Sequence, residues 1–306
     1  MRDRRPSFSI LGVIAACAAL VCAGLPMTAT AVMAGLAPDS PQARIDPNDR
    51  RSPWAAVGAV RIGEQTFTGV LIRPRFVLTA AHMIVGHPPE SIRFQLNLDR
   101  RQPTINDIER VIVHPDYRGG AGPESPNDLA LLELAGDAPS GLAIPPPYYG
   151  SLAPGTEFRF VGYGRSGSGD QGPTVDSRPD VKRVGANTAD RFIPSPSAAS
   201  MPAMFLYDFD AARRPNAMGR KGLANELESA VAPGDSGAPV FITRGGRWEL
   251  IGVMTFSTAV RQRGIAVGTF GSVGGGVLLG PSRDWIETTT SHALARVDAR
   301  PANDSP

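Results

Sequence analysis

The sequence predicts an all-β protein that ends in one α-helix. Three observations support this prediction. Short runs of β-branched and other apolar residues recur along most of the chain, turn residues separate them, and no long amphipathic helix lies among them. The 34 glycines and 29 prolines in 306 residues fit many turns between short strands. Antiparallel barrels or sandwiches are the architectures that this density of strands favours.

The predicted strands form two sets, separated by three consecutive prolines at 145–147. The first set covers 55–62, 67–72, 76–79, 92–96, 108–113 and 129–134. The second set covers 157–162, a run near 182–187, 203–209, 239–242, 248–256 and 275–279. We therefore expect two β units, over residues 53–147 and 148–297.

A single helix is predicted at the end of the second unit. Ser282 fits an N-cap position, and Asp284 and Glu287 put acidic side chains near the start of the helix. The helix is expected to reach about Val297. Residues 298–306 are rich in Pro, Asn, Asp and Ser, so we expect a disordered tail there.

The N-terminus has the pattern of a signal peptide over residues 1–31. Three early arginines precede an apolar run over 8–25, and Ala29-Thr30-Ala31 matches a cleavage site. Cleavage is expected after Ala31, with Ala34 as a second option. Two alternatives remain: an uncleaved membrane anchor, or a lipoprotein modified at Cys17. Residues 32–52 are interpreted as a leader or linker.

Export and charge set the expected partners. Cys17 and Cys22 both lie in the predicted signal peptide, so the mature chain would have no disulfide and would depend on its core for stability. The net charge is +2, and residues 1–31 account for it with three arginines and one aspartate. The sequence therefore indicates no nucleic-acid partner and no stable membrane association after cleavage. We expect a secreted or periplasmic monomer.

Ser236 is the candidate nucleophile. It lies in Pro233-Gly234-Asp235-Ser236-Gly237-Ala238-Pro239, where flanking glycines allow a sharp turn that exposes the hydroxyl. The alternative is an ordinary turn serine. A serine hydroxyl is a weak nucleophile until a neighbouring base takes its proton, so the chain must also supply a base and an acid that orients it.

His82, in Leu78-Thr79-Ala80-Ala81-His82, is the candidate base. The other histidines have weaker contexts, because His87 lies beside prolines, His114 precedes a proline and His292 falls on the predicted helix. A base must be neutral to accept a proton, so activity should fall on acidification through the range where histidines titrate.

Asp128 is the candidate orienting acid. It stands at the head of the apolar run 129–134, where a buried carboxylate needs a hydrogen-bond donor such as an imidazole N–H. The alternative is a turn cap formed with Asn127. The other nearby aspartates precede no such run; they are Asp99, Asp107 and Asp116.

These segments resemble the chymotrypsin-like (trypsin-fold) serine peptidases, especially the secreted bacterial members. The order His, Asp, Ser is that of this family and differs from other serine hydrolases. The resemblance extends over about 53–297. It rests on segments 68–72, 78–82, 113–117, 127–134, 161–164, 234–239 and 284–286.

The resemblance implies two six-stranded antiparallel β-barrels, an active site between them and a C-terminal helix on the outside. It also implies an oxyanion hole formed by the backbone N–H groups of Gly234 and Ser236. Asp235, between them, often pairs in the family with an N-terminal ammonium created by cleavage. This chain has no Ile-Val-Gly-Gly segment. Arg44-Ile45 could be cleaved in the same way, but Asp46-Pro47 follows it.

The specificity pocket is also inferred from the resemblance. Counting back six residues from the nucleophile puts Ala230 at the base of the pocket, with 255–257 (Thr255, Phe256 and Ser257) as one wall and Gly276 on the other. An uncharged base favours a small or apolar P1 residue. A register slip of two residues would place Glu228 there and favour a basic P1 residue.

Residues 165–225 are long and irregular, and we interpret them as surface loops between strands. Asp208, Asp210 and Asn216 could bind a structural calcium ion, although a solvated strand face is the favoured interpretation of these residues. No cofactor and no catalytic metal are expected.

The predicted function is therefore that of a secreted serine endopeptidase acting on polypeptides through an acyl-enzyme. Two alternatives remain open: a catalytically silent binding protein on the same fold, and an esterase-type hydrolase that uses the same acyl chemistry.

Overall fold

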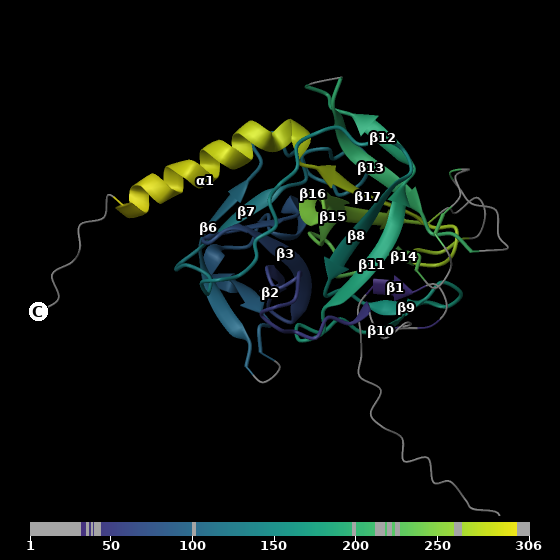
Figure 1. Ribbon diagram of the computed structural model, residues 1–306, viewed down its shortest axis with the longest axis horizontal. Coiled ribbons are helices and arrows are strands. Elements are labelled where there is room, and N and C mark those ends of the chain that lie inside the picture. The colour runs from purple at the N-terminus through teal and green to yellow at the C-terminus, as the bar shows by residue number, and fades with distance from the viewer. Residues whose placement is uncertain are drawn as a thin grey trace, which may run out of the picture.

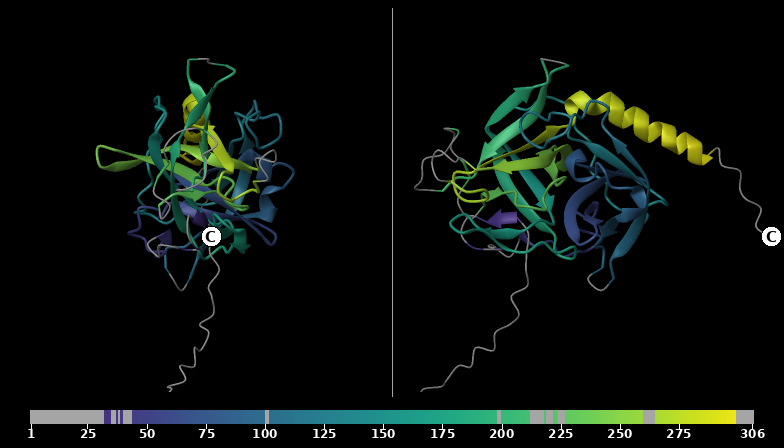
Figure 2. Two further views of the ribbon diagram at one scale, coloured as in Figure 1. Left: turned by 90° about the vertical axis from the view of Figure 1, so that its right-hand side faces the viewer. Right: turned by 180° about the vertical axis from the view of Figure 1, so that it is seen from behind.

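The computed structural model describes residues 32–34, 37, 39, 44–99, 102–197, 200–211, 218, 222–223, 227–259 and 265–298. The predicted signal peptide and the tail beyond Asp298 lie outside these residues, as do Glu226, which neighbours the alternative pocket base, and Asn216. Two β-rich halves lie side by side, with the earlier half in blue and the later half in green to yellow (Figure 2, right).

The first half is a closed antiparallel barrel of six strands, in the order β2-β3-β4-β7-β6-β5. Its inward side chains, such as Val60, Leu78 and Leu131, are fully buried. Apolar residues that alternate along these short strands thus form one core, as the sequence pattern predicts. The strands are β2 (Val57–Ile62), β3 (Gln65–Arg73), β4 (Phe76–Thr79), β5 (Ile92–Leu96), β6 (Thr104–Val113) and β7 (Ala130–Leu134).

The second half is built around a seven-stranded sheet in the order β11-β8-β15-β16-β17-β13-β12. Bulges between β15 and β16 and between β16 and β17 curve this sheet. Its strands are β8 (Thr156–Gly162), β11 (Arg183–Ala189), β12 (Arg191–Pro194), β13 (Pro202–Asp208), β15 (Pro239–Arg244), β16 (Arg247–Thr258) and β17 (Val273–Leu278).

The all-β prediction is confirmed, but this second unit differs from a closed six-stranded barrel. Side chains connect parts of the sheet where no strand ladder does. The Asp190 carboxylate accepts the Asp208 N–H at 3.1 Å, and Asn187 Nδ2 donates to the carbonyls of Asp208 and Ser229 at 2.9 and 3.0 Å. The sheet therefore curves like a half-barrel, and hydrogen bonds from polar side chains join segments that no strand pairing connects.

Residues at the start of the described chain are part of the fold. Val32–Ala34 forms β1, which is fully buried between β9 (Ser166–Ser168) and β14 (Ser229–Ala230), and β10 (Gly172–Val175) completes this small sheet (Figure 1). The leader or linker expected at 32–52 thus differs from the structure. Its apolar residues Val32 and Met33 complete the second core, which the sequence pattern around them did not reveal.

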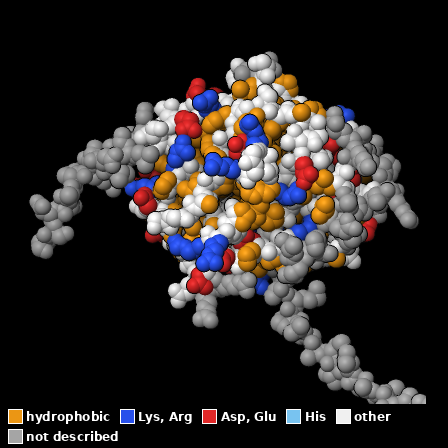
Figure 3. Space-filling view, viewed as in Figure 1, with side chains coloured by type: hydrophobic (Ala, Val, Ile, Leu, Met, Phe, Trp, Pro, Cys, Tyr) orange, Lys and Arg blue, Asp and Glu red, His pale blue; other side chains and the backbone are white. Residues whose placement is uncertain are grey.

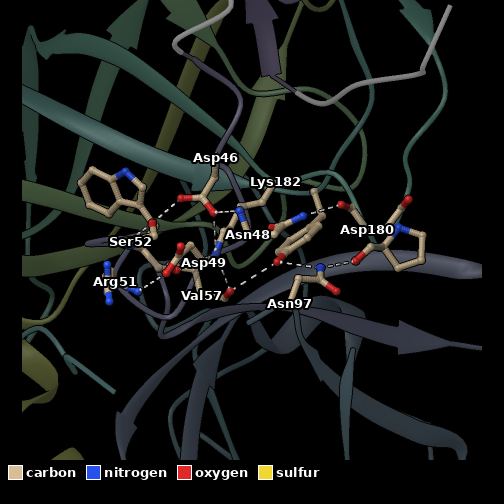
Figure 4. A network of polar contacts seen from close by, with 12 residues as sticks. Asp46, Asn48, Asp49, Arg51, Ser52, Val57, Asn97, Asp180 and Lys182 are labelled. Atoms are coloured by element: carbon tan, nitrogen blue, oxygen red, sulfur yellow. Dashed lines mark hydrogen bonds and ion pairs between the residues drawn. The ribbon is translucent and has the colours of Figure 1, made fainter. Parts of the chain in front are cut away.

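A buried polar network joins the segment around Asp46 to both halves (Figure 4). Lys182, with no exposed surface, lies 3.3 Å from Asp46 and donates to the Trp54 carbonyl at 2.8 Å. Tyr163 donates to the Val57 carbonyl at 3.3 Å and accepts from Asn97 at 3.2 Å. Burial lowers the pKa of Lys182, which Asp46 opposes. The network fixes the two halves relative to each other.

The C-terminal helix α1 (Arg283–Asp298) follows a short 3-10 turn at Gly280–Ser282 and lies on the outside of the molecule (Figure 1). The Trp285 ring packs edge-on against His114 of the first barrel, with ring centroids 4.7 Å apart. The Glu287 carboxylate pairs with Arg73 at 2.7 Å. The predicted helix is confirmed within one residue at each end.

On the face shown in Figure 3, acidic and basic side chains are interspersed without a broad area of one sign. Among the described residues, no helix has the length and apolar character needed to cross a membrane. Within the same residues, no group of three or more His, Cys, Asp and Glu side chains is arranged to hold a metal ion.

Candidate active site

His82 lies on a 3-10 turn at Ala81–Met83, directly after β4. The small residues Ala80 and Ala81 are fully buried, which lets the chain turn sharply against the barrel. The side chain of His82 keeps 22% of its surface exposed. The imidazole is therefore held by a rigid turn yet remains open to a substrate.

Asp128 precedes β7 and has no exposed surface. Its two carboxylate oxygens both bind His82: Oδ1 accepts the backbone N–H at 2.8 Å, and Oδ2 lies 2.7 Å from ring Nδ1. The hydrogen bond from Nδ1 leaves Nε2 unprotonated in the neutral ring, so that nitrogen can act as a base.

Ser236 lies on a tight loop between β14 and β15, and its hydroxyl is 3.0 Å from His82 Nε2. Two flanking residues have positive φ, Gly234 at 97° and Gly237 at 78°, and glycine adopts this conformation without strain. A Cβ atom on Gly237 would lie 2.2 Å from Thr79 Oγ1. The loop thus needs glycine for both conformation and space.

The first barrel also holds this loop through Thr68 on β3. Its N–H donates to the Ser236 carbonyl at 3.1 Å, and its hydroxyl donates to the Gly234 carbonyl at 3.3 Å. The same hydroxyl accepts the N–H of Tyr163 at 3.0 Å. Thr68 therefore connects the loop that carries Ser236 to both halves of the molecule.

Asp235 is fully buried behind the loop. Its Oδ1 accepts the N–H of Gly164 and its Oδ2 accepts the N–H of Ala232, both at 2.9 Å. Burial raises the pKa of this carboxyl to about 7, while these hydrogen bonds and the charge of Arg183 oppose the rise. The carboxylate fixes the backbone on either side of Ser236.

Beside Ser236 lies a cavity of about 230 Å³. Its walls include the apolar side chains of Val231, Met254, Phe256 and Val267 and the hydroxyl-bearing residues Thr255 and Ser257. Asp235 also borders the cavity, but its carboxylate is bonded inward to the loop. Among the residues that the structure describes, no other charged residue lines the cavity.

The expected wall at 255–257 therefore borders this cavity, but two other predicted pocket residues do not. Ala230 belongs to β14 and is paired with Met33 of β1, behind the pocket. Gly276 faces Met254 on β16, and a Cβ atom there would lie 2.2 Å from the Val253 carbonyl. Counting residues missed Val231, which lies one position beyond Ala230. Nothing in the sequence marked Val267, which lies on the connection between β16 and β17.

Glu228, the alternative base of the pocket, points elsewhere. It is fully buried, and its Oε1 accepts the N–H of Asp210 at 2.7 Å. Burial raises the pKa of Glu228 to about 8 and that of Asp210 to about 7. Neither residue lines the cavity. Asp208, the other expected calcium ligand, accepts the Met218 N–H at 2.7 Å.

The competing histidines and aspartates lie away from the nucleophile. His87 is exposed, and His114 packs on Trp285. Asp107 pairs with Arg93 at 2.9 Å, and Asp116 lies 3.4 Å from Arg118. The side chain of His292 is outside the described part of the chain.

Two β-sheet halves with a histidine, an aspartate and a serine meeting between them define the class of chymotrypsin-like folds. The trypsin family model matches residues 44–196 of this chain. The chain belongs to the trypsin family of serine peptidases. The match includes His82 and Asp128, and Ser236 lies beyond it.

Named relatives agree with this family. The rat "Vitamin K-dependent protein C" is 29% identical over 208 residues, which cover 67% of this chain and 43% of the relative. An "Uncharacterized peptidase" of Corynebacterium glutamicum is 25% identical over 244 residues, covering 79% and 70%. A "Trypsin" of Saccharopolyspora erythraea is 29% identical over 129 residues, covering 41% and 56%. The chain thus spans less than half of the rat relative.

Proposed function

We propose that this chain is a secreted serine endopeptidase that cleaves peptide bonds through His82, Asp128 and Ser236. The observation that carries the proposal is the continuous hydrogen-bonded path from Asp128 through the His82 ring to the Ser236 hydroxyl, at 2.7 and 3.0 Å. Both distances are those of hydrogen bonds between a nucleophile, its base and the group that orients the base.

In the proposed reaction, His82 Nε2 takes the hydroxyl proton as Ser236 Oγ attacks the substrate carbonyl carbon. The imidazolium then donates that proton to the leaving amine, and the C–N bond breaks to leave an acyl-enzyme. Water, deprotonated by the same nitrogen, attacks the ester carbonyl carbon. The bond to Ser236 Oγ then breaks, the proton on Nε2 passes to Oγ, and the acid is released. The buried Asp128 carboxylate stabilises the imidazolium both when the acyl-enzyme forms and when it is hydrolysed.

The oxyanion would be stabilised by the backbone N–H groups of Gly234 and Ser236. Removing one such donor typically costs about 3 kcal/mol of transition-state stabilisation. The anchoring of Asp235 to Gly164 and Ala232 supports this role, because it limits the movement of the loop that carries both donors.

The lining of the cavity supports a preference for small or apolar P1 side chains. Within the described part of the chain, a lysine or arginine at P1 would meet no available carboxylate, since Asp235 is bonded inward and Glu228 does not line the cavity. Burying an unpaired cation is costly, so cleavage after basic residues is disfavoured. We propose that the natural substrates are polypeptides. The enzyme would act on them as a monomer, outside the cytoplasm.

A fluorophosphonate probe tests the proposal. Wild-type protein should be labelled and should hydrolyse casein, whereas Ser236→Ala should do neither and keep the wild-type thermal midpoint. A peptide library then reports the P1 residue. Absence of labelling in folded wild type would support a silent binding protein, and hydrolysis of esters but not of peptides would support an esterase.

A further inference from the structure

The carboxylate of Asp235 occupies space that two glycines on and beside β8 leave empty. A Cβ atom on Gly162 would lie 2.0 Å from Asp235 Oδ1, and one on Gly164 would lie 2.8 Å from it. Both carboxylate oxygens accept backbone N–H groups, from Gly164 and Ala232. Two acceptor oxygens suit the ionised form, because a proton on either one would face an N–H donor.

Arg183 lies on the same side of the sheet as this carboxylate. It is directly opposite Gly162 in the antiparallel β8–β11 pair, and residues paired in this way direct their side chains to the same face, about 5 Å apart. Arg183 is 1% exposed. Its Nε donates to Asp39 at 2.8 Å and its Nη1 to the Val181 carbonyl at 3.4 Å, while Nη2 has no hydrogen-bond partner among the described residues.

The two buried charges influence each other. The charge of Arg183 lowers the pKa of Asp235, against the burial that raises it. The charge of Asp235 in turn raises the pKa of Arg183, which burial lowers to about 10. Each group therefore favours the charged form of the other, in a buried place where water does not stabilise the charges.

We propose that Arg183 is a positioning residue for the loop Gly234–Ser236: its internal cation lies behind Asp235 in place of an N-terminal ammonium, so that the backbone N–H groups of Gly234 and Ser236 are held in place. This inference rests on the proposed function. It implies that the uncut chain is active, and that cleavage between Arg44 and Ile45 is not an activation step.

The surroundings of Arg44 and Ile45 fit an uncut chain. Ile45 forms an isolated β-bridge with Arg183, and the Asp46 N–H donates to the Lys182 carbonyl at 2.9 Å. Arg44 is 8% exposed, and its guanidinium donates to the Ser229 hydroxyl and the Glu228 carbonyl. The peptide bond between the two residues is thus flanked by packed side chains and backbone pairing.

Other titratable groups near Arg183 and Asp235 are few. The Tyr207 hydroxyl accepts the Val231 N–H at 3.0 Å, and burial raises its pKa, to which Asp235 contributes. Tyr207 therefore stays neutral across the working range of pH. The Asp39 carboxylate accepts a hydrogen bond from Arg183 and partly neutralises its charge, whereas the positive charge of Arg178 lowers the pKa of Arg183.

The pH dependence of probe labelling tests Arg183. Arg183→Met should move the acid limb of the labelling rate to higher pH by at least about one pH unit. The labelling rate at pH 6.5 should therefore fall at least about tenfold, and it should recover toward the wild-type rate at pH 9. Arg183→Lys keeps the cation and should restore most of the wild-type profile. A purely structural role would lower the rate equally at every pH, and that result would overturn the proposal.

Two further variants keep the test decisive if Arg183→Met folds poorly. Asp39→Asn removes the carboxylate that partly neutralises Arg183. The acid limb of the labelling rate should therefore stay in place or move to lower pH, and a move to higher pH would count against the proposal. Asp235→Asn imitates the protonated acid. It should lose labelling at all pH values, and adding Arg183→Met to it should change nothing more.

The N-terminus of the labelled protein provides an independent measurement. Intact-mass analysis of the fluorophosphonate adduct should find chains that still contain the Arg44–Ile45 bond. If only chains that begin at Ile45 are labelled, an N-terminal ammonium is required and the proposal is wrong. If wild type is never labelled at any pH, the proposed function itself fails, which the Ser236→Ala control distinguishes from the failure of Arg183 alone.

Discussion

Asp128 receives two hydrogen bonds from the single residue His82, one from its backbone and one from its ring. The backbone bond fixes the turn that carries the imidazole, and the ring bond selects the tautomer. A carboxylate can accept both at once because each oxygen takes one donor. The position and the protonation of the base are thus set by one buried side chain.

The first prediction separates these two effects. Asp128→Asn retains one oxygen for the backbone N–H of His82, but its NH₂ group faces ring Nδ1 and selects the wrong tautomer. The rate of probe labelling and of peptide hydrolysis should fall by about 10⁴-fold, with little change in the thermal midpoint. A loss of less than tenfold would show that the ring bond does not orient the base.

The second prediction concerns the space that Gly162 leaves for Asp235. Gly162→Ala would put a Cβ atom 2.0 Å from Asp235 Oδ1, so the carboxylate must move and release the loop. We expect a loss of labelling of at least about 100-fold and a destabilisation of about 2 kcal/mol, as for other overpacked sites. Gly136→Ala is the matched control, because nothing lies within 4 Å of a Cβ atom there. Equal behaviour of the two variants would contradict the packing argument.

The third prediction is a change of stability with pH. Burial raises the pKa of Glu228 from 4.5 to about 8 and that of Asp210 from 3.8 to about 7, so the folded chain binds these protons more tightly than the unfolded chain. Their contribution to stability is complete below about pH 4 and is lost as the pH rises through 8. The free energy of unfolding should therefore decline over this range.

Glu228→Gln tests this dependence. Glutamine keeps an acceptor for the Asp210 N–H and adds a donor where, among the described residues, Glu228 Oε2 and Asp210 Oδ1 lack hydrogen-bond partners. The variant should exceed wild type by about 2 kcal/mol in urea unfolding at pH 8.5 and differ little at pH 5. Glu157→Gln, at a half-exposed side chain, is the control. The same decline in both variants would rule out Glu228 as its source.

The fourth prediction concerns the buried pair of Lys182 and Asp46. Lys182→Met removes a cation that has no exposed surface and leaves the Asp46 carboxylate with fewer donors. Such a loss typically costs about 3–5 kcal/mol. Asp46→Asn combined with Lys182→Met should cost less than the two single changes together, because neither charge is then left unpaired. Strictly additive unfolding energies would show that the two groups do not interact.

Much of the site could be predicted from local patterns. The glycines around Ser236, the small residues before His82 and the apolar run after Asp128 each dictate a local backbone, and each element formed as expected. The C-terminal helix likewise begins next to Ser282, where the acidic first turn predicted it. Such features depend on near neighbours, whose preferences can be inferred from the chain itself.

The pocket and the charges behind it could not be predicted in this way. Ala230 lies behind the cavity because β14 pairs with β1, almost 200 residues earlier in the chain, and Val267 borders it from a loop without any motif. Arg183 lies on the same face of the sheet as the Asp235 carboxylate only because its register places it opposite Gly162.

The sequence by itself thus determined the all-β class, the helix and the identity of the three polar groups, because each follows from short-range spacing and turn chemistry. Only the tertiary structure decided which side chains line the cavity, which segment completes the second core and which cation lies on the same face of the sheet as the Asp235 carboxylate. Those neighbours come from strand register between distant segments, where a shift of one residue sends a side chain to the opposite face.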